Sequence, residues 1–315
     1  MFKHILVPLD GSRLAEVVLP AAGYLARVLG AQVTLVHIIE QGAPASVHGE
    51  RHLTRAEEAE GYLEEAARRA FSPDLPVRRH VHTEAMENIA RGIVEHQAEL
   101  APDLILMCTH GRSGLRDLLF GRIAQQVVAS GHTPVLLMRP QRPNPREPFL
   151  CRTLLAPTDG KPTHERGLEM AFDLARATNA RVELLAVVPT MDKLAGSHAA
   201  SGRFMPGATR VVLEVAQEQL ESYLGHQADR GQARGVAVSA SVLRGDPASV
   251  IVETAARVDA DIIVLGTHGK AGAEAFWAHS VTAGVLAKTT RPLLLVPVLP
   301  ARHEGRKGRS VREKG

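Results

Sequence analysis

The sequence has few of the features that mark membrane, disulfide-rich or zinc-binding proteins. Only two of its 315 residues are cysteines, Cys108 and Cys151, and they do not form a CxxC pair. Two isolated cysteines argue against a disulfide framework and favour a reducing, cytoplasmic location. No run of about 18 apolar residues occurs, so we expect no membrane-spanning helix and no membrane partner.

Several catalytic and phosphate-binding signatures are also missing. The patterns GxxxxGK[ST] and GxGxxG do not occur, which excludes a Walker loop and the dinucleotide fingerprint. The serine elbow GxSxG is absent, and the 15 histidines form no HExxH motif. We therefore expect neither catalytic residues nor a metal site, and a slow ATPase is the least favoured of the functions considered below.

The basic charge of the chain is concentrated near its C-terminus. The net charge is +3, but residues 301–315 alone hold six basic and two acidic residues. The rest of the chain is therefore close to neutral, which does not favour nucleic acid as a partner. A tail rich in Gly, Arg and Lys cannot pack a core, so residues 300–315 are predicted to be a disordered basic tail.

The chain contains the same three sequence blocks twice, in the same order. The first pair is separated by 149 positions and the other two pairs by 158, which identifies a tandem repeat. The paired blocks are Lys3–Gly11 with Arg152–Gly160, Asp103–Gly111 with Asp261–Gly269, and Thr133–Met138 with Arg291–Val296. We predict one domain over residues 1–140, a linker over 141–150 and a second domain over 151–299.

Each copy alternates short apolar runs with helical patterns. Continuous apolar runs are typical of strands buried on both faces of a parallel sheet. The predicted strands are 3–9, 32–39, 76–82, 103–107 and 134–138, then 152–158, 181–188, 237–243, 261–265 and 292–297. In the first copy the predicted helices are one capped by Ser12 and reaching Val28, followed by 56–70, 89–99 and 122–130. The pattern predicts two Rossmann-like α/β domains, each a five-stranded parallel sheet flanked by helices.

A ligand in such a fold binds beyond the carboxyl ends of the strands, where the strand order reverses. The first strand of each copy is followed by Asp-Gly, with the carboxylates Asp10 and Asp159. A carboxylate there can accept hydrogen bonds from ribose hydroxyls. The alternative is that Asp10 caps a helix or forms a turn.

The loop after the fourth strand is rich in glycine and leads into a helix. Backbone N–H groups at a helix entry can bind phosphate oxygens. Together with the opening strand and the Pro-led last strand, this loop resembles the universal stress protein family, whose nucleotide-binding members carry G-x2-G-x9-G-[ST]. The resemblance covers about residues 2–140 and 151–298. It implies an adenine nucleotide α-hydrolase-like fold and a regulatory protein of the stress response that binds ATP or AMP, with Mg²⁺ accompanying ATP.

Both copies depart from the family pattern. The first reads Cys108-x2-Gly111-x9-Gly121-Arg122, so that a cation replaces the final hydroxyl and can pair with a phosphate. The second reads Gly266-x2-Gly269-x9-His279-Ser280, and His279 adds a side chain where the backbone should approach phosphate closely. We therefore expect the first copy to be the better nucleotide site.

The resemblance also implies a set of nucleotide-binding residues, among which Ile38 and Val187 would contact adenine. The first-copy candidates are Pro8, Asp10, Ile38, Met107, Gly111, Arg112, Gly114, Gly121, Arg122 and Ile123, and the second-copy candidates are Pro157, Asp159, Val187, Gly266, Gly269, Ser280 and Val281. Degenerate loops leave a second hypothesis open, in which the protein is a structural or interaction member of the family that binds no nucleotide.

The last strand of each copy should lie at a sheet border, and an apolar border strand invites pairing. Family members pair through this strand, so the two copies are expected to form a pseudo-dimer within the chain. Two chains are expected to associate further as a homodimer, and a protein partner remains unknown. The polar segments 41–54 and 190–208 follow the second strands and could fold over the crevices as lids.

Overall fold

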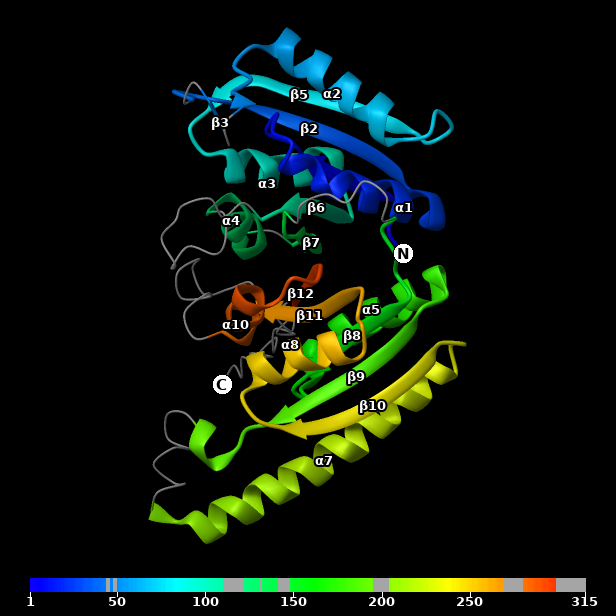
Figure 1. The fold of residues 1–315 in the computed structure, drawn as a ribbon, viewed down its shortest axis with the longest axis vertical. Coiled ribbons are helices and arrows are strands. Elements are labelled where there is room, and N and C mark those ends of the chain that lie inside the picture. Colours follow the sequence, from blue (N-terminus) through cyan, green and yellow to red (C-terminus); the bar gives the residue numbers. More distant parts are fainter. Residues whose placement is uncertain are drawn as a thin grey trace, which may run out of the picture.

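A single ten-stranded sheet runs through the molecule (Figure 1). The structure is a computed structural model and describes residues 1–43, 46–47, 50–109, 122–130, 132–140, 148–194, 204–268 and 280–298. The strand order is β10-β9-β8-β11-β12-β7-β6-β1-β2-β5. The first-copy strands are β1 (His4–Pro8), β2 (Gln32–Glu40), β5 (Val77–Met86), β6 (Leu104–Cys108) and β7 (Val135–Met138). The second-copy strands are β8 (Thr153–Thr158), β9 (Arg181–Val188), β10 (Ala237–Arg244), β11 (Ile262–His268) and β12 (Leu293–Val298).

The two halves of the sheet have the same topology. Within each half all neighbouring strands are parallel, which confirms the predicted fold class. The halves meet where β7 and β12 pair antiparallel, with Leu136 opposite Leu294. The expected pairing of the two last strands is therefore present, at the centre of the molecule in Figure 1.

Helices cover both faces of the sheet. The described helices are α1 (Leu19–Leu29), α2 (Ala56–Ala70), α3 (Ile89–Leu100), α4 (Arg122–Ser130), α5 (Glu165–Thr178), α7 (Pro206–Gln232), α8 (Pro247–Arg257) and α10 (Val281–Lys288), with short 3-10 turns η1 (Ala15–Val18), η2 (Pro162–His164) and η3 (Met191–Lys193). One apolar core holds residues of α1, α2, α5 and α7, and the other holds residues of α3, α4, α8 and α10. The two cores lie on opposite faces of the sheet, because alternate strand residues point to opposite faces. Each core extends through both halves. No described helix, the 27-residue α7 included, is apolar enough over sufficient length to cross a bilayer.

Three predicted boundaries need correction or stay untested. The first helix is not one continuous helix from Ser12, because η1 comes first and α1 begins only at Leu19. Pro20 has no backbone N–H to donate within a longer helix, but a proline is tolerated in the first turn of α1. Ser12 is not the N-cap of either element, since Leu14 precedes η1 and Val18 precedes α1, although its hydroxyl oxygen accepts a hydrogen bond from the Ala15 N–H at 3.2 Å. Strand β5 is longer than predicted and reaches Met86, opposite Glu40 of β2. Most of the predicted linker 141–150 and all of the tail 300–315 lie outside the described residues, so the domain boundaries stay predictions.

Truncating the junction should weaken the whole fold. Leu294 is 1% exposed and belongs to the core that contains residues of both halves. We expect Leu294→Ala to lower the free energy of unfolding by about 2–5 kcal/mol, the cost of a buried cavity. Urea denaturation followed by circular dichroism measures the effect. Val28→Ala, on an exposed position of α1, is the matched control, and an equal loss in both variants would contradict a structural role of the junction.

Candidate functional site

The loops that the sequence singled out come from neighbouring strands at the centre of each half. Strand β1 lies beside β6, and β8 lies beside β11. On either side of each pair the strand order continues in opposite directions, so each pair is a topological switch point. In the first half, Asp10 follows β1 and Cys108 ends β6. Burial raises the pKa of the Cys108 thiol to about 12, and the negative charge of Asp10 adds to the shift.

In the first half, Asp10 forms the turn that leads into η1. Its Oδ1 accepts hydrogen bonds from the Ser12 N–H at 2.9 Å and from the Ser12 hydroxyl at 2.7 Å. Gly11 has φ +90°, a conformation that favours glycine. The turn role that the sequence left open for Asp10 is therefore present. The same hydrogen bonds fix the half-buried carboxylate at the carboxyl end of β1.

The segment after β2 folds back over this turn. It forms a small hairpin of β3 (Ser46–Val47) and β4 (Glu50–Arg51), and Leu53 then covers Gly11, where an added Cβ would lie 2.9 Å from the leucine Cδ1. Glu50 Oε1 accepts a hydrogen bond from the Arg13 N–H at 3.0 Å. The described part of segment 41–54 thus lies against the Asp10 turn.

The sequence analysis missed one residue that contacts both the end of β1 and the segment after β2. His37 is buried in β2, with Nδ1 2.8 Å from the Leu9 carbonyl oxygen and Nε2 3.3 Å from that of Leu53. Burial lowers the pKa of His37, so the ring is neutral and donates one N–H, which the shorter distance assigns to Leu9. A histidine within the apolar run Leu35–Ile39 was the signal that could have identified it.

In the second half, the corresponding aspartate contacts a lysine and a histidine. Asp159 Oδ1 lies 2.6 Å from His164 Nδ1, and Oδ2 lies 3.0 Å from Lys161 Nζ. Partial burial favours the neutral acid, but hydrogen bonds from His164 and Lys161 outweigh it and hold the pKa of Asp159 well below its usual range. Gly160 has φ +77° and is covered by Leu220 of α7 instead of by a hairpin.

The end of β11 uses its glycine for packing. A Cβ at Gly266 would lie 3.3 Å from the His164 carbonyl oxygen, and one at Gly167 would lie 3.0 Å from the Gly266 nitrogen. Two glycines therefore let the start of α5 approach β11 closely. The repeat offsets place Val18 and Cys108 at these positions in the first half, where both residues are buried. The change of Gly to Cys at the end of the fourth strand thus accompanies a larger residue on the facing helix.

The remaining candidates lie at strand ends or helix starts. Pro8 and Pro157 are half-buried, Ile38 and Met107 are buried, and Val187 is half-buried. Ser280 is the N-cap of α10, whereas Ile123 and Val281 are largely exposed at the starts of α4 and α10. Gly111, Arg112, Gly114, Gly121 and Gly269 lie outside the described residues, as does the side chain of Arg122.

The pattern of two like domains has a counterpart among known proteins. A sequence model of the universal stress protein family matches this chain twice, over residues 1–139 and 151–297. The chain belongs to the universal stress protein family. Relatives of this universal stress protein include Universal stress protein Rv2623 of Mycobacterium tuberculosis, which is 25% identical over 95% of this chain and 96% of its own length. Universal stress protein MJ0531 of Methanocaldococcus jannaschii is 29% identical over 44% of this chain and 83% of its own length.

Solved structures agree with the fold. A universal stress protein from Archaeoglobus fulgidus superposes with a TM-score of 0.62 at 16% identity, covering 94% of this chain and 96% of that one. A functionally unknown protein from Pseudomonas aeruginosa gives a TM-score of 0.65 at 16% identity, covering 94% and 93%. At this identity the likeness concerns the fold alone.

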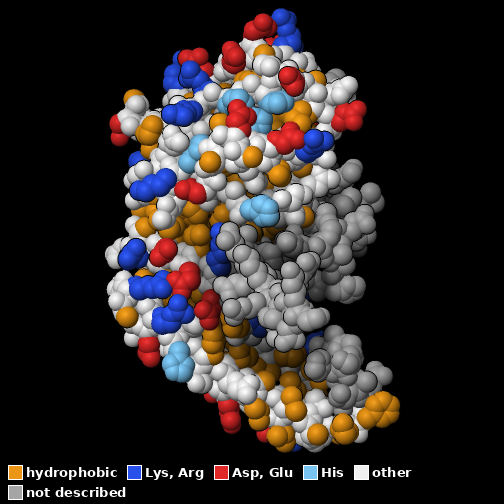
Figure 2. Space-filling model, turned by 180° about the vertical axis from the view of Figure 1, so that it is seen from behind, with side chains coloured by type: hydrophobic (Ala, Val, Ile, Leu, Met, Phe, Trp, Pro, Cys, Tyr) orange, Lys and Arg blue, Asp and Glu red, His pale blue; other side chains and the backbone are white. Residues whose placement is uncertain are grey.

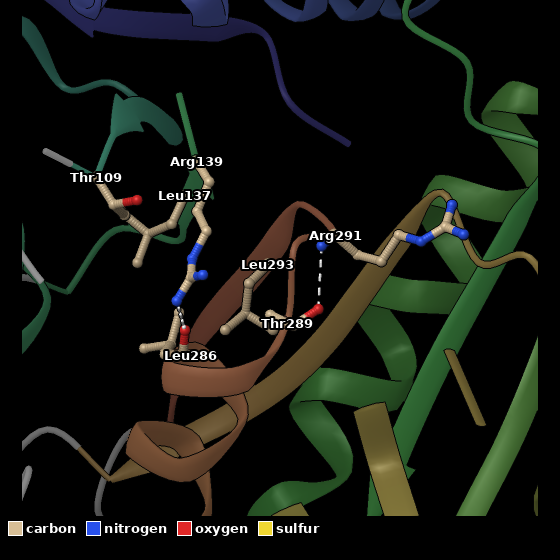
Figure 3. Close-up of a pocket in the computed structure, with 7 residues that line it drawn as sticks. All are labelled: Thr109, Leu137, Arg139, Leu286, Thr289, Arg291 and Leu293. Atoms are coloured by element: carbon tan, nitrogen blue, oxygen red, sulfur yellow. Dashed lines mark hydrogen bonds between the residues drawn. The ribbon is translucent and has the colours of Figure 1, made fainter. Parts of the chain in front are cut away.

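A small hollow lies at the junction of the two halves (Figure 3). The described residues that line it are Thr109, Leu137, Arg139, Leu286, Thr289, Arg291 and Leu293, and none of these is a predicted nucleotide-binding residue. Arg139 Nη2 donates hydrogen bonds to the carbonyl oxygens of Leu286 at 2.6 Å and Ala287 at 3.0 Å. The guanidinium of the first half thus satisfies carbonyls at the C-terminus of α10, and we interpret the hollow as part of the junction.

The Asp159 contacts predict a pH-dependent contribution to stability. A carboxyl whose folded pKa is depressed stabilises the fold above its unfolded pKa of about 3.9, and this contribution disappears as the pH falls through the folded value. Because Asp159 is partly exposed, we expect Asp159→Asn to cost on the order of 1 kcal/mol or less at pH 7. Urea midpoints at pH 7 and pH 3 test this. The deficit should shrink at pH 3, and the exposed Asp229→Asn on α7 should show none; a deficit independent of pH would refute the assignment.

Proposed function

We propose that this universal stress protein is a regulatory protein of the stress response that binds an adenine nucleotide, ATP or AMP. The proposal depends mainly on one observation: the carboxylate of Asp10 is fixed at the switch point beside the end of β6, from which the glycine-rich segment departs. A ribose held by Asp10 would place its phosphates toward that segment. Ile38 at the end of β2 would contact the adenine.

The phosphate end of the proposed site is supported by sequence and by the start of α4. Gly111, Gly114 and Gly121 precede this helix, and Arg122 is its first residue. The N–H groups at a helix start attract anions, and the positive charges of Arg112 and Arg122 would add to the attraction. We propose that Mg²⁺ accompanies ATP when ATP is the ligand.

The first half is proposed as the better site because its phosphate loop keeps a glycine, Gly121, where the backbone should approach phosphate closely. In the second half a ribose hydroxyl would also compete with the contacts that Asp159 makes with Lys161 and His164. His279 adds a side chain in the predicted phosphate loop of that half.

Calorimetric titration of the full chain with ATP and AMP tests the proposal. We expect Asp10→Ala to weaken nucleotide binding at least about tenfold, which corresponds to losing about 1.4 kcal/mol. Asp159→Ala should change the Kd by less than about twofold. Asp10→Asn is the matched variant, because asparagine keeps an oxygen for the Ser12 turn and removes only the charge.

Each outcome of the titration has a defined meaning. No heat with ATP or AMP at protein concentrations near 100 μM would overturn nucleotide binding at Kd values below about 1 mM. It would instead favour the second candidate, a structural or interaction member whose turn is covered by Leu53. Equal losses in Asp10→Ala and Asp159→Ala would overturn the preference for the first half. Continuous release of phosphate from ATP over many turnovers would contradict the expectation that the protein has no catalytic residues.

We further propose a cytoplasmic location and association of two chains. Both cysteines are free and buried, and burial raises the pKa of Cys151 to about 11, so neither thiol is in its reactive form at neutral pH. Light scattering at two protein concentrations should give twice the chain mass of 33.9 kDa. A mass of 33.9 kDa at both concentrations would contradict the homodimer. Any protein partner is expected to recognise the nucleotide-bound form.

A further inference from the structure

Three histidines of the first half come together away from the proposed nucleotide site. His80 and His82 lie on β5, and His96 lies on α3. One ring nitrogen from each lies within 4.8 Å of the others, and the ring centroids of His80 and His82 are 4.7 and 5.0 Å from that of His96. Figure 2 shows histidine side chains beside an acidic one on the surface of this half of the molecule. The sequence did not indicate the cluster, because 14 residues separate His82 from His96 along the chain.

His96 presents its Nε2 lone pair to the other two rings. It is 2% exposed, and its Nδ1 lies 2.7 Å from the carbonyl oxygen of Gly92. A carbonyl can only accept, so Nδ1 carries the proton and Nε2 of the neutral ring does not. A backbone carbonyl that fixes the tautomer in this way is the usual support of a metal-binding histidine.

The contact between His96 and His80 also suits a metal. Their Nε2 atoms are 2.8 Å apart, so the His80 Nε2–H donates to the lone pair of His96. With metal–nitrogen bonds of about 2.0–2.1 Å, tetrahedral ligand atoms lie about 3.3 Å apart. The two Nε2 atoms therefore need to move apart by only about 0.5 Å to bind one ion. The His80 proton would move from Nε2 to Nδ1, so that Nε2 can bind the metal.

A fourth ligand is within reach. Glu99 lies one turn beyond His96 on α3, and its Oε2 is 3.9 Å from His96 Nε2. The side chain of Glu99 is 63% exposed, so the cluster opens to solvent on this side and an ion can enter. Three imidazoles and one carboxylate form a donor set that zinc binds in a tetrahedral site.

The second half shows that the fold itself does not need these histidines. In the sheet register, His80 is opposite Val36, and the equivalent residue opposite Leu185 is Ser241. By the same register His82 corresponds to Leu243, and the repeat offset of 158 pairs His96 with Thr254. Matching strands and helix therefore form with a serine, a leucine and a buried threonine in these places.

We propose that His80, His82 and His96, with Glu99 as the fourth ligand, bind one zinc ion that links the border strand β5 to α3. This function is independent of nucleotide binding. The ion would hold the outermost strand of the first half to the helix that follows it in the chain. His82 lies opposite Ile38 in the sheet, so the ion would also stabilise the strand that carries the proposed adenine contact.

To test the proposal, the untagged, full-length protein is dialysed against a chelator and then titrated with ZnCl₂. We expect one zinc per chain by calorimetry and an increase in the melting temperature. Co²⁺ should give the intense visible absorption of a tetrahedral site, in contrast to the weak spectrum of the hydrated ion. The double variant His82→Leu and His96→Thr copies the second half, and it should weaken zinc binding by a factor of about 100 or more.

Controls separate this site from general affinity for histidine. His226→Asn, at an exposed position on α7, should bind zinc as the parent does. Glu99→Gln should weaken binding and alter the Co²⁺ spectrum without changing the melting temperature of the metal-free protein. His80→Ser serves as a second ligand variant should the double variant fail to fold. No stoichiometric uptake by the parent, or unchanged binding in the ligand variants, would overturn the proposal and leave the cluster a hydrogen-bonded packing feature.

Discussion

The antiparallel pairing of β7 with β12 is the contact on which the rest of the structure depends. Each half would otherwise expose a short strand of Val and Leu at the border of its sheet, with unpaired backbone groups. Pairing joins the two sheets, allows each apolar core to extend through both halves, and brings Arg139 to the C-terminus of α10. The remaining borders are β5 and β10, and β5 carries exposed Arg78, Arg79 and Glu84, which discourage further strand pairing.

On this shared scaffold, the two switch points have become different sites. Both keep an aspartate and a glycine with positive φ after the first strand, since the turn requires them. The surroundings of the aspartates nevertheless differ: Ser12 hydrogen-bonds to Asp10 in the first half, and His164 and Lys161 contact Asp159 in the second. The residues that cover the two glycines differ as well: Leu53 of a loop covers Gly11, and Leu220 of the long helix α7 covers Gly160. A duplicated fold thus retains its backbone geometry while the side chains around equivalent residues diverge.

The same divergence explains the histidine cluster. Positions on β5 and α3 that face each other tolerate histidine in one half and Ser, Leu and Thr in the other, because strand pairing and the neighbouring apolar residues maintain the packing. Equivalent positions in a repeat therefore serve as internal references. A polar cluster present in one copy and absent from the other is not a requirement of the fold.

The sequence by itself determined the fold class, the repeat and nearly every strand, because apolar periodicity and the spacing of repeated blocks are local properties of the chain. It also identified Asp10 and Asp159 as residues at equivalent strand ends. Only the tertiary structure decided which groups surround them, since Ser12 and His164 act through turn geometry and Leu220 arrives from a helix far along the chain. The approach of His96 on α3 to His80 and His82 on β5 likewise depends on tertiary packing, which the spacing of these residues along the chain does not reveal.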